Sequence, residues 1–143
     1  MLTNLPFTLS ALRAAYAAGT SPSDVIDEIF LRLDKVNDPG LFIHLRDRES
    51  LKAEAAALGA YDPTMPLWGI PYAAKDNIDV GGIETTAGCP AYAYLPQNDA
   101  FVIANLRAAG AMMIGKTNLD QFATGLVGIR TPYGAPLNAV DPE

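Results

Sequence analysis

The sequence predicts an α/β fold in which helices flank a central sheet, and three observations support this prediction. Residues 1–60 show the apolar spacing and capping signals of helices, whereas residues 67–114 read as strand, helix and strand. Half of the 143 residues are apolar and 18% are charged, a composition that indicates a packed core rather than a disordered chain. A strand-helix-strand order further predicts parallel strands joined by a right-handed crossover.

The first part of the chain, residues 1–60, is expected to be an N-terminal helical region. The strongest start signal is Ser21, followed by Pro22 at the first helical position and by Asp24, which completes a capping box. The expected elements are a helix over residues 8–18 capped by Thr8, a helix over 21–36, a strand over 41–44 and a helix over 47–58. The side chains expected to face inward are Leu9, Leu12, Tyr16, Val25, Ile29, Leu33, Val36, Leu51, Ala55 and Leu58.

The second part, residues 61–143, is expected to hold the first strand-helix-strand part of a larger core. The expected order is a buried strand over 67–75, a helix capped by Asn98 or Asp99 with Val102, Ile103, Leu106 and Ala109 inward, a buried strand over 111–114 and a loop-helix segment over 116–125. The last dozen residues contain no further helix or strand signal. We therefore expect an incomplete sheet and one truncated domain.

Charge and composition exclude several classes of function. The formal net charge of −6 disfavours nucleic acid as a partner, because phosphate binding needs a basic surface. One cysteine, Cys89, and one histidine, His44, are too few for a zinc cluster or a histidine-dependent nucleophile, so we expect no metal and no cofactor. No apolar run approaches the roughly 20 residues that span a bilayer, and the first residues lack the basic start of a signal peptide. We therefore expect a cytoplasmic protein without a membrane partner.

Lys75 is the most unusual residue of the sequence, because it ends an apolar strand. Strand alternation places it on the face of Pro71 and Ala73, with Asp76 on the other face. A desolvated lysine loses proton affinity and can then activate a serine nucleophile without histidine. The alternative is a lysine that extends from a strand end into water.

A second lysine, Lys116, lies in a segment that matches the nucleotide-binding P-loop pattern. Gly110, Gly115, Lys116 and Thr117 fit G-x-x-x-x-G-K-[ST]. A P-loop needs a strand before its first glycine and a phosphate-binding loop between the two, whereas here a helix precedes Gly110 and the intervening residues form a strand. Nucleotide binding is therefore not expected.

Glycines follow this segment at positions where main chain could approach a small polar substrate. Gly125, Gly128 and Gly134, with Thr124 and Arg130, could form such a loop, and ordinary turn chemistry is the alternative. The remaining polar and aromatic candidates are expected to be structural: His44 at the core or an edge, Cys89 buried, Tyr92 and Tyr94 in packing, and Asp120 and Gln121 capping a helix or facing solvent.

Residues 69–77, Gly-Ile-Pro-Tyr-Ala-Ala-Lys-Asp-Asn, resemble the lysine strand of the amidase-signature family. The likeness extends over residues 85–88, 106–111 and 114–123, and residues 76–80, 119–128 and 132–136 are most similar to allophanate hydrolases within that family. The resemblance covers nearly the whole chain. It implies the N-terminal portion of a fold with a mixed central sheet flanked by helices.

This resemblance implies an activity and a site. Lys75 would be the base of a Ser–cis-Ser–Lys triad that hydrolyses an amide through an acyl-enzyme, and main chain at Ala123, Gly125 and Gly128 would border the pocket for a small amide or carboxylate substrate. Allophanate hydrolases convert the product of a urea carboxylase to ammonia and carbon dioxide, so the resemblance also implies urea carboxylase as a pathway partner.

The serine-bearing segment of the family is not among these residues. The four serines present are Ser10, Ser21, Ser23 and Ser50, all in the N-terminal helical region. We therefore expect no amidase activity from these residues alone, unless a second chain supplies the serines. The expected protein partner is that missing serine-bearing part of the amidase or, as the alternative, a second copy in a homo-oligomer. The alternative is a non-catalytic binding or assembly module derived from the amidase fold.

Overall fold

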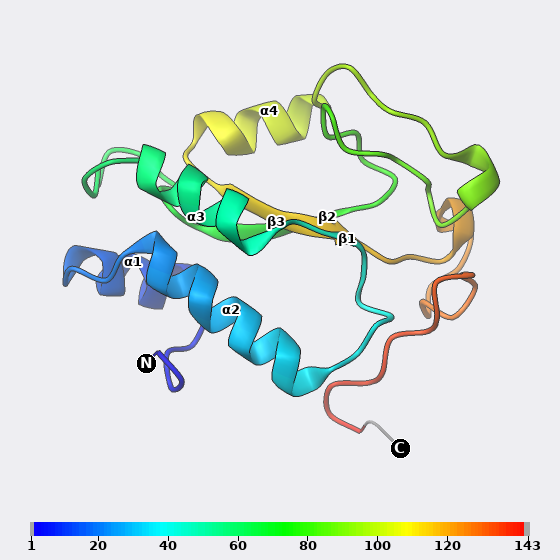
Figure 1. The fold of residues 1–143 in the computed structure, drawn as a ribbon, viewed down its shortest axis with the longest axis horizontal. Coiled ribbons are helices and arrows are strands. Elements are labelled where there is room, and N and C mark those ends of the chain that lie inside the picture. The colour runs from blue at the N-terminus through cyan, green and yellow to red at the C-terminus, as the bar shows by residue number, and fades with distance from the viewer. Residues whose placement is uncertain (1, 142–143) are drawn as a thin grey trace. The chain divides into compact units, whose positions relative to one another are not determined.

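The computed structural model describes residues 2–141 (Figure 1). Its elements are α1 (Leu9–Ala17), α2 (Pro22–Val36), β1 (Phe42–Leu45), α3 (Arg48–Ala57), β2 (Pro71–Lys75), the 3₁₀ helix η1 (Pro90–Tyr92), α4 (Phe101–Ala108), β3 (Met112–Thr117) and the 3₁₀ helix η2 (Gln121–Ala123). No helix of this described part has both the length and the apolar character needed to cross a membrane.

The chain divides into two compact units whose segments alternate along the sequence. Unit 1 comprises the residues up to Asn37 together with Arg46–Tyr72 and Asn105–Ile114. Unit 2 comprises Asp38–Leu45, Ala73–Ala104 and the residues from Gly115 onward.

The three strands form a mixed sheet in the order β1-β3-β2, which confirms the predicted α/β class. β1 is antiparallel to β3, with His44 opposite Lys116 and an irregularity between Phe42 and His44. Main-chain hydrogen bonds join Met112 to Ile70 at one end of β3 and Asp76 to Thr117 at the other. The residue numbers of both strands therefore increase in the same direction, so β2 and β3 are parallel, as predicted.

Local signals set the helix ends of unit 1 as predicted. The Ser21 side chain accepts a hydrogen bond from Asp24 N at 3.1 Å, and the Asp24 carboxylate accepts one from Ser21 N at 3.0 Å, so the capping box is complete. Asn37 ends α2 in the left-handed conformation, with φ of 48°. Thr8 caps α1 and Asp47 caps α3.

Unit 1 contains two apolar clusters. The first consists of Leu12, Tyr16, Val25, Trp68 and Ile70, and the second of Ile26, Leu51, Ala55, Met112 and Ile114. The Tyr16 hydroxyl donates a 2.6 Å hydrogen bond to Gly69 O, and burial raises the pKa of Tyr16. The inward prediction is wrong for three side chains, which are largely exposed: Leu9, Val36 and Val102.

Two strand lengths differ from the prediction. β2 begins at Pro71 rather than at residue 67, because Gly69 adopts a φ of +68° that no extended strand contains. β3 runs on to Thr117, because pairing with β1 continues over Gly115 and Lys116. Of the loop-helix segment expected over residues 116–125, the described structure contains only the three-residue 3₁₀ helix η2.

Candidate active site

Lys75, the predicted base, ends β2 in unit 2 and is exposed to solvent. The predicted alternation is confirmed, since Ala73 and Lys75 lie on one face and Ala74 and Asp76 on the other. Of the two alternatives for the amine, desolvation and extension into water, the described residues show the second, because in this part of the sheet the face of Ala74 and Asp76 is the buried one. Strand parity fixes which residues share a face but does not tell which face is covered.

Asp76, the next residue, is held at each of its polar groups but one. Its main-chain N–H donates to Thr117 O at 3.1 Å, and its carbonyl accepts from Ala87 N at 3.2 Å. Its carboxylate oxygen Oδ2 accepts from the Thr86 hydroxyl at 2.5 Å and from Thr86 N at 3.0 Å. Because these contacts fix the residue that follows Lys75, they fix the main chain from which the lysine extends.

The remaining carboxylate oxygen of Asp76 faces Lys116, and both side chains are fully buried. Lys116 Nζ lies 3.0 Å from Asp76 Oδ1 in an ion pair, although the geometry is not that of a hydrogen bond, and Oδ1 accepts none within the described residues. The amine donates to Thr85 Oγ1 at 2.7 Å and to Glu84 O at 3.2 Å. The lysine of the P-loop-like segment therefore neutralises a buried carboxylate.

A strained turn connects Asp76 to the predicted substrate wall. Ala87, Phe122 and Ala123 have φ values of 52°, 53° and 55°, which non-glycine residues rarely adopt. Phe122 N donates to Ala87 O at 2.8 Å, and Gln121 Nε2 donates to Gly88 O at 3.2 Å. Such strain persists only where surrounding contacts impose it, and it clusters at functional sites.

Asp120 organises the loop that contains the predicted wall residues. Its carboxylate accepts hydrogen bonds from Val127 N and Gly128 N, both at 3.0 Å, and from Arg130 N at 2.7 Å. The N–H groups of Arg130 and Gly128 hold the pKa of Asp120 below its usual range. Asp120 is buried, so the expectation that it faces solvent is wrong. It stands at the N-cap position of η2, but its side chain makes no capping hydrogen bond there.

The structure brings Ala123, Gly125 and Gly128 together around this carboxylate. Ala123 N donates to the main-chain carbonyl of Asp120 at 2.7 Å, and Gly128 N binds the carboxylate itself. A side chain at Gly125 would collide with the carboxylate of Asp120. The link to Lys75 passes through Asp76, Ala87 and Phe122, and all of these residues belong to unit 2.

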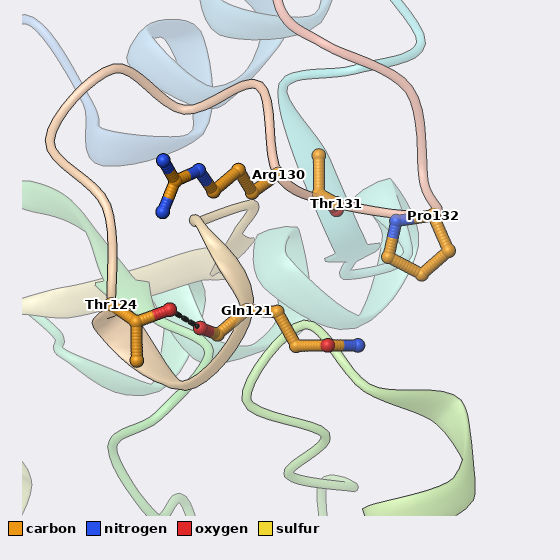
Figure 2. A pocket seen from close by; sticks show the side chains of 5 residues that line it. All are labelled: Gln121, Thr124, Arg130, Thr131 and Pro132. Atoms are coloured by element: carbon orange, nitrogen blue, oxygen red, sulfur yellow. Dashed lines mark hydrogen bonds between the residues drawn. The ribbon is translucent and has the colours of Figure 1, made fainter.

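An open cavity of about 340 Å³ lies beside this loop and is lined by Gln121, Thr124, Arg130, Thr131 and Pro132 (Figure 2). The side chains of Arg130 and Gln121 point in opposite directions, and the Thr124 hydroxyl donates to Gln121 O at 2.8 Å (Figure 2). Lys75 does not line the cavity. The residues that line the cavity therefore do not converge on one substrate atom.

A search of the described residues for a metal site gives no group of three or more His, Cys, Asp or Glu side chains that could hold a metal ion.

The other candidates have structural surroundings. His44 is exposed on β1, and Cys89 is half-buried, so the expectation of a buried cysteine is wrong. Tyr92 lies edge-on to Tyr94 and to Phe122, with ring centroids 5.6 and 5.3 Å apart, which supports the predicted packing role. The Tyr94 hydroxyl donates to Asp79 at 2.6 Å, and this hydrogen bond raises the pKa of Tyr94 to about 12.

Sequence reasoning missed three residues that hold this site together: Asp76, Lys116 and Asp120. The alternation around Lys75 already placed Asp76 on the opposite face, so the alternative in which Lys75 extends into water carried with it a buried carboxylate in need of a cation. For Asp120 the signal was the presence of Gly125 and Gly128 within eight residues, because glycines let a loop close around a side chain.

Comparison with known proteins gives one family. Residues 24–143 match the sequence profile of the amidase family. The urea amidolyase of Saccharomyces cerevisiae is 65% identical over 71 residues, which are 50% of this chain and 4% of that protein. A glutamyl-tRNA(Gln) amidotransferase polypeptide of Thermus thermophilus is 38% identical over 134 residues, which are 92% of this chain and 28% of that protein.

A solved structure agrees with these relatives. The S177A allophanate hydrolase of Kluyveromyces lactis superimposes with a TM-score of 0.75 and 38% sequence identity, over 94% of this chain and 22% of that one. The chain thus spans less than a third of the length of each of these proteins.

Proposed function

The chain belongs to the amidase family, and from that premise we propose that it carries the lysine and one substrate wall of a site that hydrolyses allophanate. The observation that supports this most is the position of Lys75, which extends from the end of β2 next to Asp76, whose main chain and Oδ2 are held by hydrogen bonds. The 38% identity to a solved allophanate hydrolase, together with the 65% identity to a urea amidolyase over half of this chain, favours allophanate over other amides.

In the proposed reaction Lys75 acts as a general base. Its neutral amine takes a proton from the hydroxyl of a bridging serine. The bridging serine in turn takes a proton from the nucleophilic serine, whose hydroxyl oxygen forms a bond to the amide carbon. The C–N bond then breaks, the leaving nitrogen takes the proton, and ammonia departs. Water hydrolyses the remaining ester and restores the serine.

The proposal requires polypeptide that these 143 residues do not include. All four serines of the chain belong to unit 1, whereas Lys75 belongs to unit 2. Two of them, Ser21 and Ser50, are hydrogen-bonded to Asp24 and Asp47 at the starts of helices. The serines are therefore supplied by another segment or by a second, different chain. That polypeptide also covers the exposed amine, because desolvation favours the neutral form of a lysine.

The substrate wall of the proposal is main chain at Ala123, Gly125 and Gly128. The N–H groups of Ala123 and Gly128 donate to Asp120, so a small carboxylate-bearing amide would meet the other main-chain groups of this loop, which small side chains leave open to close approach. Because the substrate is the product of a urea carboxylase, the proposed pathway partner is that enzyme, and the proposed compartment is the cytoplasm.

The test is ammonia release from allophanate by two proteins. One is the 143-residue chain alone, for which we expect no turnover. The other is an allophanate hydrolase in which this chain replaces the matching N-terminal segment. In that chimera, Lys75→Ala should lower kcat by on the order of 10²–10⁴-fold or more, whereas Lys35→Ala at the end of α2 should leave it unchanged. L-glutamine, another primary amide, serves as the competing substrate.

Activity of the Lys75→Ala chimera equal to that of its parent would overturn the proposal. The exposure of Lys75 favours one other function, a non-catalytic module whose lysine face binds a partner. That module predicts a stable complex with the serine-bearing segment that Lys75→Ala weakens, and no turnover by the chimera.

A further inference from the structure

We propose that Asp120 is the positioning residue of the substrate wall, whose carboxylate sets the course of the main chain over residues 121–130. The inference rests on the proposed function, because the course of this loop matters to the reaction only if the loop borders the substrate.

The hydrogen bonds of Asp120 define the shape of the loop. One oxygen, Oδ2, accepts from Val127 N and Gly128 N, and the other, Oδ1, accepts from Arg130 N. A main-chain hydrogen bond joins the two ends of the loop, since Gln121 N donates to Arg130 O at 2.8 Å. Three N–H groups from the far side of the loop thus meet one carboxylate at its beginning.

Apolar packing does not hold this loop in the described structure. Leu126, Val127 and Ile129 are 102%, 67% and 63% exposed. A loop without buried apolar side chains keeps one conformation only through polar contacts. The Asp120 carboxylate supplies these contacts from the side of the loop that is buried.

Two further features agree with a side chain inside the loop at this position. Gly125 leaves the space that this carboxylate occupies, because a Cβ there would collide with it. Phe122 and Ala123 keep left-handed main-chain conformations, and Ala123 N donates to Asp120 O at 2.7 Å. Contacts that impose such strain also fix the direction of the neighbouring N–H and C=O groups.

The chemistry of the contacts predicts what asparagine does at this position. All three partners of the carboxylate are N–H donors, so Asp120→Asn places an NH₂ group opposite at least one donor. The loop then loses at least one hydrogen bond while the size of the side chain is unchanged.

The test uses the ¹⁵N-labelled 143-residue chain and malonamate, a stable molecule with one amide and one carboxylate. In the wild type, the amide signals of Val127, Gly128 and Arg130 should shift together as acid protonates Asp120, whose pKa the charge of Arg130 also lowers. They should also shift on adding malonamate. Asp120→Asn should abolish the first response and weaken malonamate binding at least tenfold.

The matched control is Asp47→Asn, because Asp47 also accepts from an N–H and a hydroxyl, those of Ser50, but caps α3 in unit 1. It should change malonamate affinity less than twofold. Unchanged amide signals of Thr85 and Lys116 show that unit 2 of the Asp120 variant is folded. If they are lost, Gly125→Ala is used instead, since it crowds the carboxylate without removing it, and it should weaken binding similarly.

Wild-type binding that Asp120→Asn leaves intact would overturn the positioning role alone. No malonamate response in the wild type at any concentration would overturn the proposed substrate wall and the positioning role with it. In that case the acid titration still tells whether the carboxylate orders the loop.

Discussion

Lys116 carries a buried charge whose removal has a large and calculable effect. Lys116→Met keeps an unbranched apolar stem as far as Cε but removes the ammonium group that lies 3.0 Å from Asp76 Oδ1. The Asp76 carboxylate then stays in a fully buried site without its cation. Two acceptors, Thr85 Oγ1 and Glu84 O, also lose their donor.

The magnitude follows from the distance and the burial. At 3.0 Å and an effective dielectric constant of roughly 20, the lost attraction is about 5–6 kcal/mol. Removal of one partner of a buried ion pair lowers the free energy of unfolding by about 3–5 kcal/mol in proteins. For a domain of this size the melting temperature should therefore fall by roughly 10–20 °C.

Urea denaturation followed by far-ultraviolet circular dichroism measures this effect. The control is Lys52→Met, which breaks the half-exposed Lys52–Asp27 pair and should change stability by about 0–1 kcal/mol. Adding Asp76→Asn to Lys116→Met should restore part of the loss, because the neutral amide needs no cation. If Lys116→Met is no more destabilising than Lys52→Met, the described pair contributes nothing and the reasoning is refuted.

Two further outcomes are expected. Leu51→Ala, at a side chain with no exposed surface, should lower the free energy of unfolding by about 2–5 kcal/mol. The control Leu31→Ala, at a side chain that is 52% exposed, should change it by less than about 0.5 kcal/mol. Urea titrations followed by Trp68 fluorescence measure both, and equal effects of the two substitutions would contradict the prediction. Acid should also destabilise the protein, because hydrogen bonds hold several carboxyl pKa values below the unfolded value of about 3.9. Unfolding at low pH therefore takes up protons. The stability that these carboxylates contribute above about pH 4 is lost as the pH falls through their lower folded pKa values. A urea midpoint equal at pH 7 and pH 2.5 would be inconsistent with these pKa shifts, which belong to Asp27, Asp47, Asp62 and Asp120.

The features predicted correctly from the sequence depend on neighbours within a few residues or on the order of segments along the chain. Ser21, Pro22 and Asp24 set the start of α2 through contacts inside one turn, so their spacing is sufficient evidence. The α/β class and the parallel pair followed from the order of apolar segments, which constrains how strands can be connected.

The features that the sequence did not yield depend on distant partners. Lys75 is exposed and Lys116 is buried because of which side of the sheet is covered. The apolar periodicity of a strand is the same whichever of its two faces is covered, so the sequence does not tell these lysines apart. Asp76 and Lys116 are forty residues apart, and Asp120 binds main-chain groups that have no side-chain signature. The catalytic role of Lys75 and the substrate wall remain predictions.

The alternating composition of the two units has a consequence for biosynthesis. Met112 and Ile114, from the last stretch of unit 1, complete the cluster around Leu51. On the ribosome, the early helices therefore emerge with their apolar sides unfilled, and they stay so until translation has reached the strand that covers them. Nascent chains of this protein should thus be clients of chaperones that shield apolar surface during synthesis.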